Sequence, residues 1–184
     1  MTFKKHFNTN RKDEVLEKYG LQIKDTFLKT LTTLITPIQY DYFNPANPQY
    51  NVSWTHRYYK DTVGYNGIGK FTGIRSYVST KAAYTNYMDD GKWVPKTYTD
   101  DHLLGATDIG KFVVDEFIKN DLNVHYMVTV WLPEHLYIWG TVRVTKEENK
   151  ASNILRGTCK KLGMTIEQKL NFKHYVNTSP ILYK

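Results

Sequence analysis

The pattern of apolar positions changes its period within residues 108–145, and this change is the clearest structural signal in the chain. In the first part of this region the apolar side chains recur at helical spacing, at Phe112, Val113, Phe117 and Ile118. In the second part they alternate with period two, as they do in strands. The pattern therefore predicts a helix followed by two strands, 124–132 and 136–144, joined by a hairpin centred on Pro133.

Both faces of the predicted hairpin are largely apolar. One face of its first strand carries Val124, Tyr126, Val128, Val130 and Leu132. The other face carries His125, Met127, Thr129 and Trp131. Because an apolar sheet face is normally covered, we expect core helices on one side. The other side is expected to meet a ligand, a second helix layer or a partner chain.

The N-terminal part of the chain predicts one helix and a second hairpin. Residues 11–35 are predicted to be helical because apolar side chains recur at intervals of three and four, at Val15, Leu16, Tyr19, Ile23, Phe27, Leu31, Leu34 and Ile35. Pro37 is expected to end this helix. Residues 38–43 and 52–59 are predicted to be two paired strands, since the segment between them is rich in Asn and Pro.

The remaining segments complete the predicted fold. Residues 60–107 carry a weaker, glycine-rich pattern that indicates a helix over 74–87 and a short strand over 93–98. A final helix is predicted over 149–170. Taken together, the elements predict a single α+β domain over residues 1–184, with a central antiparallel sheet of about five strands flanked by helices.

Composition supports one soluble domain. The chain has 184 residues, of which 41% are hydrophobic, and this length suits one domain with a real core. No apolar run approaches the roughly 20 residues that span a bilayer, and the N-terminus lacks the apolar centre of a signal peptide. We therefore expect a cytoplasmic protein that does not bind membranes. The single cysteine, Cys159, fits a reducing compartment.

The net charge of +7 favours approach to nucleic acid or to another acidic surface. Basic residues concentrate toward the C-terminus, where a solvated helix face is the simpler explanation. The alternative is a nucleic-acid-binding surface formed by Arg143, Lys150, Arg156, Lys160 and Lys161.

Motifs that carry catalytic chemistry are incomplete. Gly64, Gly69 and Lys70 match part of a phosphate-binding loop, but Phe71 stands where a metal-binding Ser or Thr is required. The histidines lack zinc-binding spacing. The adjacent acids, Asp89 with Asp90 and Asp100 with Asp101, are of the kind that usually forms solvated caps. The sequence therefore predicts no catalytic residue, metal ligand or cofactor, and it favours a protein that is not an enzyme.

Several aromatic residues of the 108–145 region could line an apolar ligand pocket and contribute a few polar groups at the ends of their side chains. Each of them is also suited to the core. The predicted ligand-binding set is Phe112, Phe117, Tyr126, Val128, Trp131 and Trp139.

The order of elements resembles a known family of sensor domains. The segment LTTLITPIQYDYFNP and the segment DIGKFVVDEFIKNDLNVHYMVTVWLPEHLYIWGTVRVTKEE carry the likeness. They resemble the N-terminal, GAF/PAS-like sensor domain of LuxR-type helix-turn-helix transcriptional regulators. The resemblance implies a small-molecule ligand, a homodimer and a link to transcription. Only NFKHYVNTSPILYK follows Leu170, which is too short for a DNA-reading helix-turn-helix.

Three functions follow as hypotheses. The first is a non-enzymatic, ligand-sensing regulatory domain, in which the ligand shifts the balance between two helix arrangements. The second is a basic factor, for example of a mobile element, that binds nucleic acid or protein. The third is a metal-dependent enzyme that acts on nucleic acid through Asp and His residues of the glycine-rich middle, with Asp101 and His102 as the residues to change.

Overall fold

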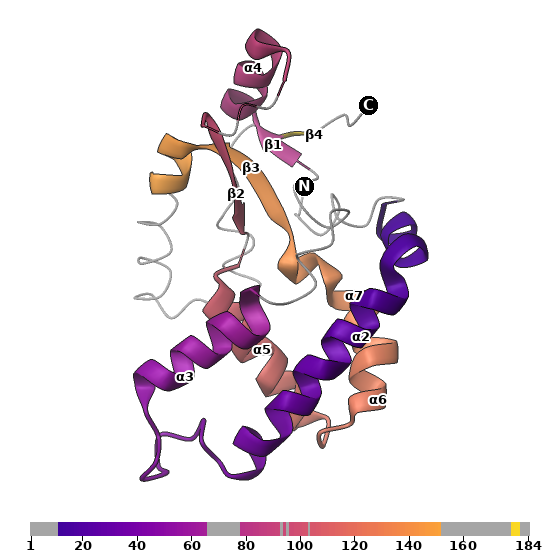
Figure 1. Cartoon of the computed structure of the whole chain (residues 1–184), viewed down its shortest axis with the longest axis vertical. Coiled ribbons are helices and arrows are strands. Elements are labelled where there is room, and N and C mark those ends of the chain that lie inside the picture. The colour runs from indigo at the N-terminus through magenta and orange to yellow at the C-terminus, as the bar shows by residue number, and fades with distance from the viewer. Residues whose placement is uncertain are drawn as a thin grey trace.

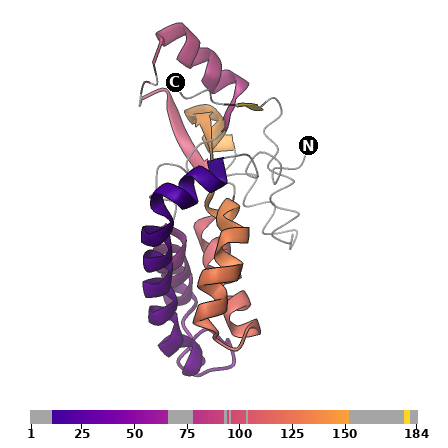
Figure 2. The ribbon, with the colours of Figure 1, turned by 90° about the vertical axis from the view of Figure 1, so that its right-hand side faces the viewer.

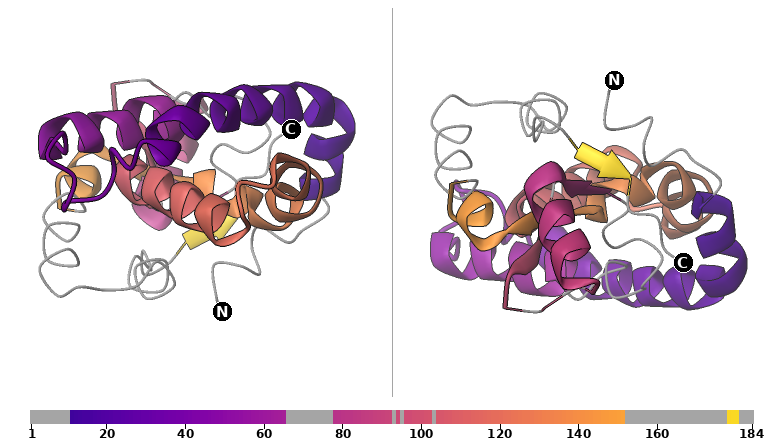
Figure 3. Two further views of the ribbon diagram at one scale, coloured as in Figure 1. Left: turned by 90° about the horizontal axis from the view of Figure 1, so that it is seen from below. Right: turned by 90° about the horizontal axis from the view of Figure 1, so that it is seen from above.

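The structure is a computed structural model that describes residues 11–65, 78–92, 94, 96–102, 104–151 and 178–180. Helices occupy one end of the molecule, and a small sheet with α4 (Lys81–Asp90) and the helix that follows β3 (Thr141–Thr145) beside it occupies the other end (Figure 1). Seen from the side, the helical end has two layers (Figure 2). Figure 3 shows the same layers from below, with α2 and α3 on one side and α5 and α6 on the other.

The first helix, α2 (Arg11–Gln39), confirms the predicted helix over 11–35 and extends it. It buries one stripe, because apolar side chains recur every three or four residues, at Ile23, Phe27, Leu31 and Leu34. The helix continues past Pro37. The strand predicted over 38–43 is therefore wrong, since its first residues belong to α2 and the rest form turns.

The second predicted strand, 52–59, is also wrong. These residues form α3 (Val52–Tyr58), which runs into the π-helix η1 (Tyr59–Tyr65). Asn51 starts α3, because its side chain accepts a hydrogen bond from the backbone N–H of Trp54 at 2.9 Å. Thr55, Tyr59 and Val63 recur every four residues and are buried, so helical spacing fits this segment better than alternation.

Helix α5 (Ala106–Lys119) confirms the helix predicted from the apolar pattern. Its buried face is formed by Ile109, Val113, Val114 and Phe117. Two glycines let α5 lie very close to η1. A Cβ atom at Gly64 would meet Ala106, and a Cβ atom at Gly110 would meet the backbone of Tyr59. The contact thus depends on two residues without side chains.

The hairpin predicted over 124–144 is wrong in its first strand and in most of its second. Residues 124–139 form a continuous series of short helical segments: α6 (Val124–Tyr126), η3 (Met127–Trp131), α7 (Leu132–His135) and η4 (Leu136–Trp139). Met127, Trp131 and Leu132 are buried whereas Val130 is exposed, which is a helical pattern. The apolar residues of this segment fit both the helical period and the strand period of two. The observed burial shows that the helical period is the correct one.

The sheet is small and mixed, so the predicted central antiparallel sheet of about five strands is also wrong. Its strand order is β2-β3-β1-β4. Strand β3 is antiparallel to β2 and parallel to β1, while β4 is antiparallel to β1. The bounds are Val78–Thr80 for β1, Tyr98–His102 for β2, Thr141–Thr145 for β3 and Thr178–Pro180 for β4.

The other two helices that were predicted are partly confirmed. Helix α4 (Lys81–Asp90) overlaps the prediction over 74–87 but begins after β1. A helix starts directly after β3, and its described residues are 146–151. The remainder of the predicted helix over 149–170 lies outside the described residues. The short strand predicted over 93–98 overlaps β2 at Tyr98, the first residue of β2.

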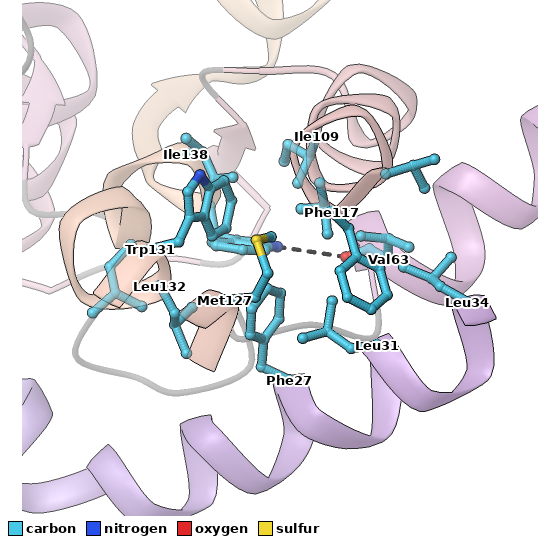
Figure 4. Close-up of a cluster of buried hydrophobic side chains, with 14 of the residues drawn as sticks. Phe27, Leu31, Leu34, Val63, Ile109, Phe117, Met127, Trp131, Leu132 and Ile138 are labelled. Atoms are coloured by element: carbon cyan, nitrogen blue, oxygen red, sulfur yellow. Dashed lines mark hydrogen bonds between the residues drawn. The ribbon is translucent and has the colours of Figure 1, made fainter. Parts of the chain in front are cut away.

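Most of the buried side chains form one cluster between the two helix layers (Figure 4). Aromatic rings fill its centre. The ring of Phe27 stacks on Trp131 with centroids 5.9 Å apart and meets the edge of Trp139 at 6.0 Å. The indole N–H of Trp139 donates to the carbonyl of Val63 at 3.5 Å. The core is therefore built mainly from helices, with the sheet beside it.

Candidate functional site

The candidate functional site lies on β2 and β3, where most of the charged and polar side chains that the sheet brings together are found. Directly paired residues share a face of a sheet, and neighbours along a strand alternate between faces. Asp100 is opposite Arg143 and His102 is opposite Thr141, so these residues share one face. Asp101 is opposite Val142 on the other face.

Arg143 and Asp100 form a two-pronged ion pair across the strands. The Nε atom of Arg143 donates to Oδ1 of Asp100 at 2.9 Å, and Nη2 donates to Oδ2 at 3.4 Å. The guanidinium carbon also lies 4.5 Å from the centre of the Tyr98 ring. Bidentate pairing and cation–π contact both hold a guanidinium in one orientation. Arg143 therefore fixes the β2–β3 register at the site.

Asp101 and His102 close β2 and stand in different environments. Asp101 is only 4% exposed, although it carries a carboxylate. Burying a carboxylate is costly unless it has partners, and Asp101 does take part in interactions. His102 is half-buried, and it also has interaction partners. An acid shielded from water therefore lies next to an imidazole that water can reach.

Glu148 ties the site to the starts of two helices. Its Oε2 atom accepts from the backbone N–H of Thr145 at 2.8 Å and from the hydroxyl of Thr80 at 2.7 Å. In return, the Thr145 hydroxyl accepts from the backbone N–H of Glu148 at 3.2 Å. This reciprocal pair is a capping box at the helix that follows β3. Thr80 also caps α4, through the N–H of Ala83 at 3.2 Å.

The capping box was missed in the interpretation of the sequence, although its signal was present. The segment TKEE at 145–148 has the S/T-x-x-E spacing of a helix start. It would have placed the start of the last helix at 146 instead of 149. The role of Arg143 in an ion pair carried no comparable local signal, because Asp100 is remote in the sequence.

The six residues predicted to bind a ligand lie in the core cluster or pack against it. Phe117, Trp131 and Trp139 are buried members of the cluster, and Figure 4 labels the first two. The other three, Phe112, Tyr126 and Val128, are half-buried and pack against it. An open pocket of about 280 Å³ does lie on α2 and η1, but none of the six lines it. Its walls are Thr26, Lys29, Thr30, Thr33 and Thr62.

The predicted nucleic-acid-binding residues are only partly placed. Arg143 lies in the site, where its guanidinium is paired with Asp100. Lys150 is exposed on the helix that follows β3. Arg156, Lys160 and Lys161 lie outside the described residues.

Comparison of the chain with protein-family models, with curated proteins and with solved structures gave no match. The resemblance to LuxR-type sensor domains therefore stays a prediction. Within the part of the chain that the structure describes, no helix is both long enough and apolar enough to cross a membrane. Within the same part, no group of three or more His, Cys, Asp or Glu side chains lies close enough together to hold a metal ion jointly.

Proposed function

We propose that the protein hydrolyses phosphodiester bonds in nucleic acid, with a divalent metal ion bound at the end of β2. The observation that carries the proposal is that β2, an edge strand, places the half-buried imidazole of His102 on the same face as the charged pair of Asp100 and Arg143. A titratable group in an unusual environment marks a candidate functional site. The net charge of +7 fits a polyanionic substrate.

The side chains of Asp100 and His102 suit two different roles. A carboxylate such as that of Asp100 is a ligand for Mg²⁺, which usually takes one or two protein carboxylates and completes its shell with water and substrate phosphates. The proposed site therefore does not need three clustered protein ligands. An imidazole with access to water suits a general base near neutral pH. Asp100 would hold the ion, and His102, on the same face, would take a proton from the water that attacks phosphorus. The P–O bond to the leaving oxygen would then break, and that oxygen would take up a proton from solvent.

The scaffold around these residues supports the proposal. The Arg143–Asp100 pair fixes the register of β2 on β3, and Glu148 fixes the helix that follows β3. Groups that perform chemistry must be held within a fraction of an ångström, so rigid supports are expected around them. The ligand-sensing hypothesis gains no such support, because its six residues already have packing roles in the core. Sensor function and homodimer formation stay predictions.

The test is cleavage of nucleic acid. The purified protein is incubated with labelled single-stranded and duplex DNA and RNA, with Mg²⁺, with Mn²⁺ or with EDTA, and the products are separated on a denaturing gel. We expect metal-dependent cleavage that Asp100→Asn and His102→Ala each reduce by about a hundredfold or more. Matched controls are Asp89→Asn and His125→Ala, which change exposed residues away from β2.

Two results would contradict the proposal. One is an absence of cleavage under every metal condition by protein whose circular dichroism shows it to be folded. The other is cleavage that the Asp100 and His102 variants retain in full. Thermal stabilisation by small metabolites, lost on changing Tyr126, would instead favour the sensor hypothesis.

A further inference from the structure

The chain turns from α2 into α3 at the end of the molecule away from the sheet (Figure 1). A group of aromatic side chains lies at this turn. We call it the aromatic corner and define it as Tyr40, Tyr42, Phe43, Trp54 and Tyr58. The rings form a connected set. Tyr40 stacks on Tyr42 with centroids 5.8 Å apart, Tyr42 meets Trp54 edge-on at 6.1 Å, and Trp54 stacks on Phe43 at 5.9 Å.

The corner is exposed at one end. Tyr40 is 63% exposed and Trp54 is 40% exposed, whereas Phe43 is half-buried and stacks on the buried Tyr59 at 5.0 Å. One face of the Tyr40 ring lies against Tyr42, while the residue as a whole remains 63% exposed. Rings fixed by neighbours and open on one face can accept a planar group with little further loss of entropy.

The aromatic corner continues into the open pocket on α2 and η1. Tyr58 contacts Trp54 with ring centroids 5.1 Å apart, and its hydroxyl donates to the carbonyl of Thr33, which lines the pocket. The pocket also contains Lys29 and three further threonines. Stacking surface and hydrogen-bonding groups therefore follow one another along the same side of α2.

The charges beside these surfaces favour an anionic partner. Lys29 and Arg57 are exposed, and neither has an ion pair among the residues that the structure describes. Two of the neighbouring acids are engaged: the Asp41 carboxylate accepts from the Asn44 amide at 2.7 Å, and Asp61 has interaction partners. A third acid, the exposed Asp25, lies four residues before Lys29 on α2. Arg57 follows Trp54 by three residues on α3, so the two side chains are neighbours on the helix surface.

From this arrangement we infer that the aromatic corner and the adjoining pocket bind single-stranded nucleic acid, with a base stacked on Tyr40 and phosphates near Arg57 and Lys29. Proteins that bind single strands combine aromatic stacking with cationic groups that follow the backbone. The choice of nucleic acid as the partner rests on the proposed function. The surface itself is separate from Asp100 and His102.

Binding is measured by fluorescence anisotropy with a labelled oligothymidine in EDTA, so that metal-dependent cleavage cannot interfere. We expect Tyr40→Ala to weaken binding by about tenfold or more, because base–aromatic stacking contributes to affinity at each base. We expect Arg57→Gln to reduce the slope of log affinity against log salt by about one. Leu21→Ala is the matched control, since Leu21 is also exposed on α2 but lies outside the corner.

The inference is overturned if Tyr40→Ala binds as tightly as Leu21→Ala. It is also overturned if sedimentation shows that the corner pairs two copies of the chain and that Tyr40→Ala separates them. The proposed function is judged separately. Tyr40-dependent binding by a protein that never cleaves nucleic acid would contradict the proposed function alone, and cleavage by Tyr40→Ala with undiminished binding would contradict this inference alone.

Discussion

The hydroxyl of Tyr58 on α3 donates a hydrogen bond of 2.8 Å to the backbone carbonyl of Thr33 in α2. In a regular helix that carbonyl would accept from the N–H four residues later, at position 37. Pro37 has no N–H, so the intrahelical bond cannot form. The phenol of Tyr58 takes its place. This contact from α3 helps α2 to continue past a proline that the sequence alone predicts as its end.

The first prediction concerns this replacement bond. We expect Tyr58→Phe to lower the free energy of unfolding by about 1 kcal/mol, because the Thr33 carbonyl, which has no partner within the helix, loses this hydrogen bond. In a Pro37→Ala background the loss should be smaller, since the new N–H can reach the Thr33 carbonyl. Urea denaturation of the four proteins forms a double-mutant cycle. Tyr40→Phe, at an exposed tyrosine, is the control, and equal losses in both backgrounds would contradict the explanation.

The second prediction compares two glycines inside helices. Gly110 lies against the backbone of Tyr59, whereas a Cβ atom at Gly20 would meet nothing within 4 Å. We expect Gly20→Ala to raise stability by roughly 0.5–1 kcal/mol through helix propensity. Gly110→Ala should lower stability, because α5 and η1 would have to separate. Thermal denaturation of both variants checks this, and a stabilised Gly110→Ala protein would rule out the close contact.

The third prediction concerns Glu148. Its carboxylate accepts hydrogen bonds from Thr145 and Thr80, so Glu148→Ala should cost about 1–2 kcal/mol in unfolding free energy. The neighbouring Glu147 is exposed, and Glu147→Ala should change stability by less than about 0.5 kcal/mol. Chemical denaturation followed by circular dichroism measures both variants. Similar losses for the two glutamates would show that the capping box contributes little.

The fourth prediction concerns pH. Burial, and then the charge of Asp115 and the nearby Tyr50, raises the pKa of Tyr59 from 10.0 to about 12. Between pH 10 and about 12, the Tyr59 hydroxyl is deprotonated in the unfolded chain but still protonated in the folded chain. Stability contributed by Tyr59 is therefore complete below pH 10 and is lost as the pH rises toward 12.

Absorbance of phenolate follows this titration directly. Tyr59→Phe should remove a late-titrating group, and Asp115→Asn should lower the pKa of Tyr59 because it removes a nearby negative charge. Asp89→Asn on α4 is the control and should leave the titration unchanged. An Asp115→Asn protein with an unaltered alkaline titration would show that the Asp115 charge does not act on Tyr59.

The candidate site shows which properties of a site local sequence patterns can predict and which they cannot. The identities of Asp101 and His102 are visible in the sequence as adjacent polar residues, but their environments are not. Asp101 is buried because β2 pairs with β3 and the sheet packs beside the helices. Arg143 looks like a free cation for nucleic acid until the same pairing brings Asp100 to its guanidinium. Burial and ion pairing are set by segments remote in the sequence, so local spacing could not predict them.

By itself, the sequence determined α2 and α5, because their apolar stripes are long enough to distinguish a helical period from alternation. It did not determine the segments over 52–59 and 124–139, where short apolar runs fit a strand and a helix equally well. There the tertiary structure decided. Helical turns put Tyr59, Val63, Met127 and Trp131 into one core, and the burial of that apolar surface outweighs the weak local preference for strand.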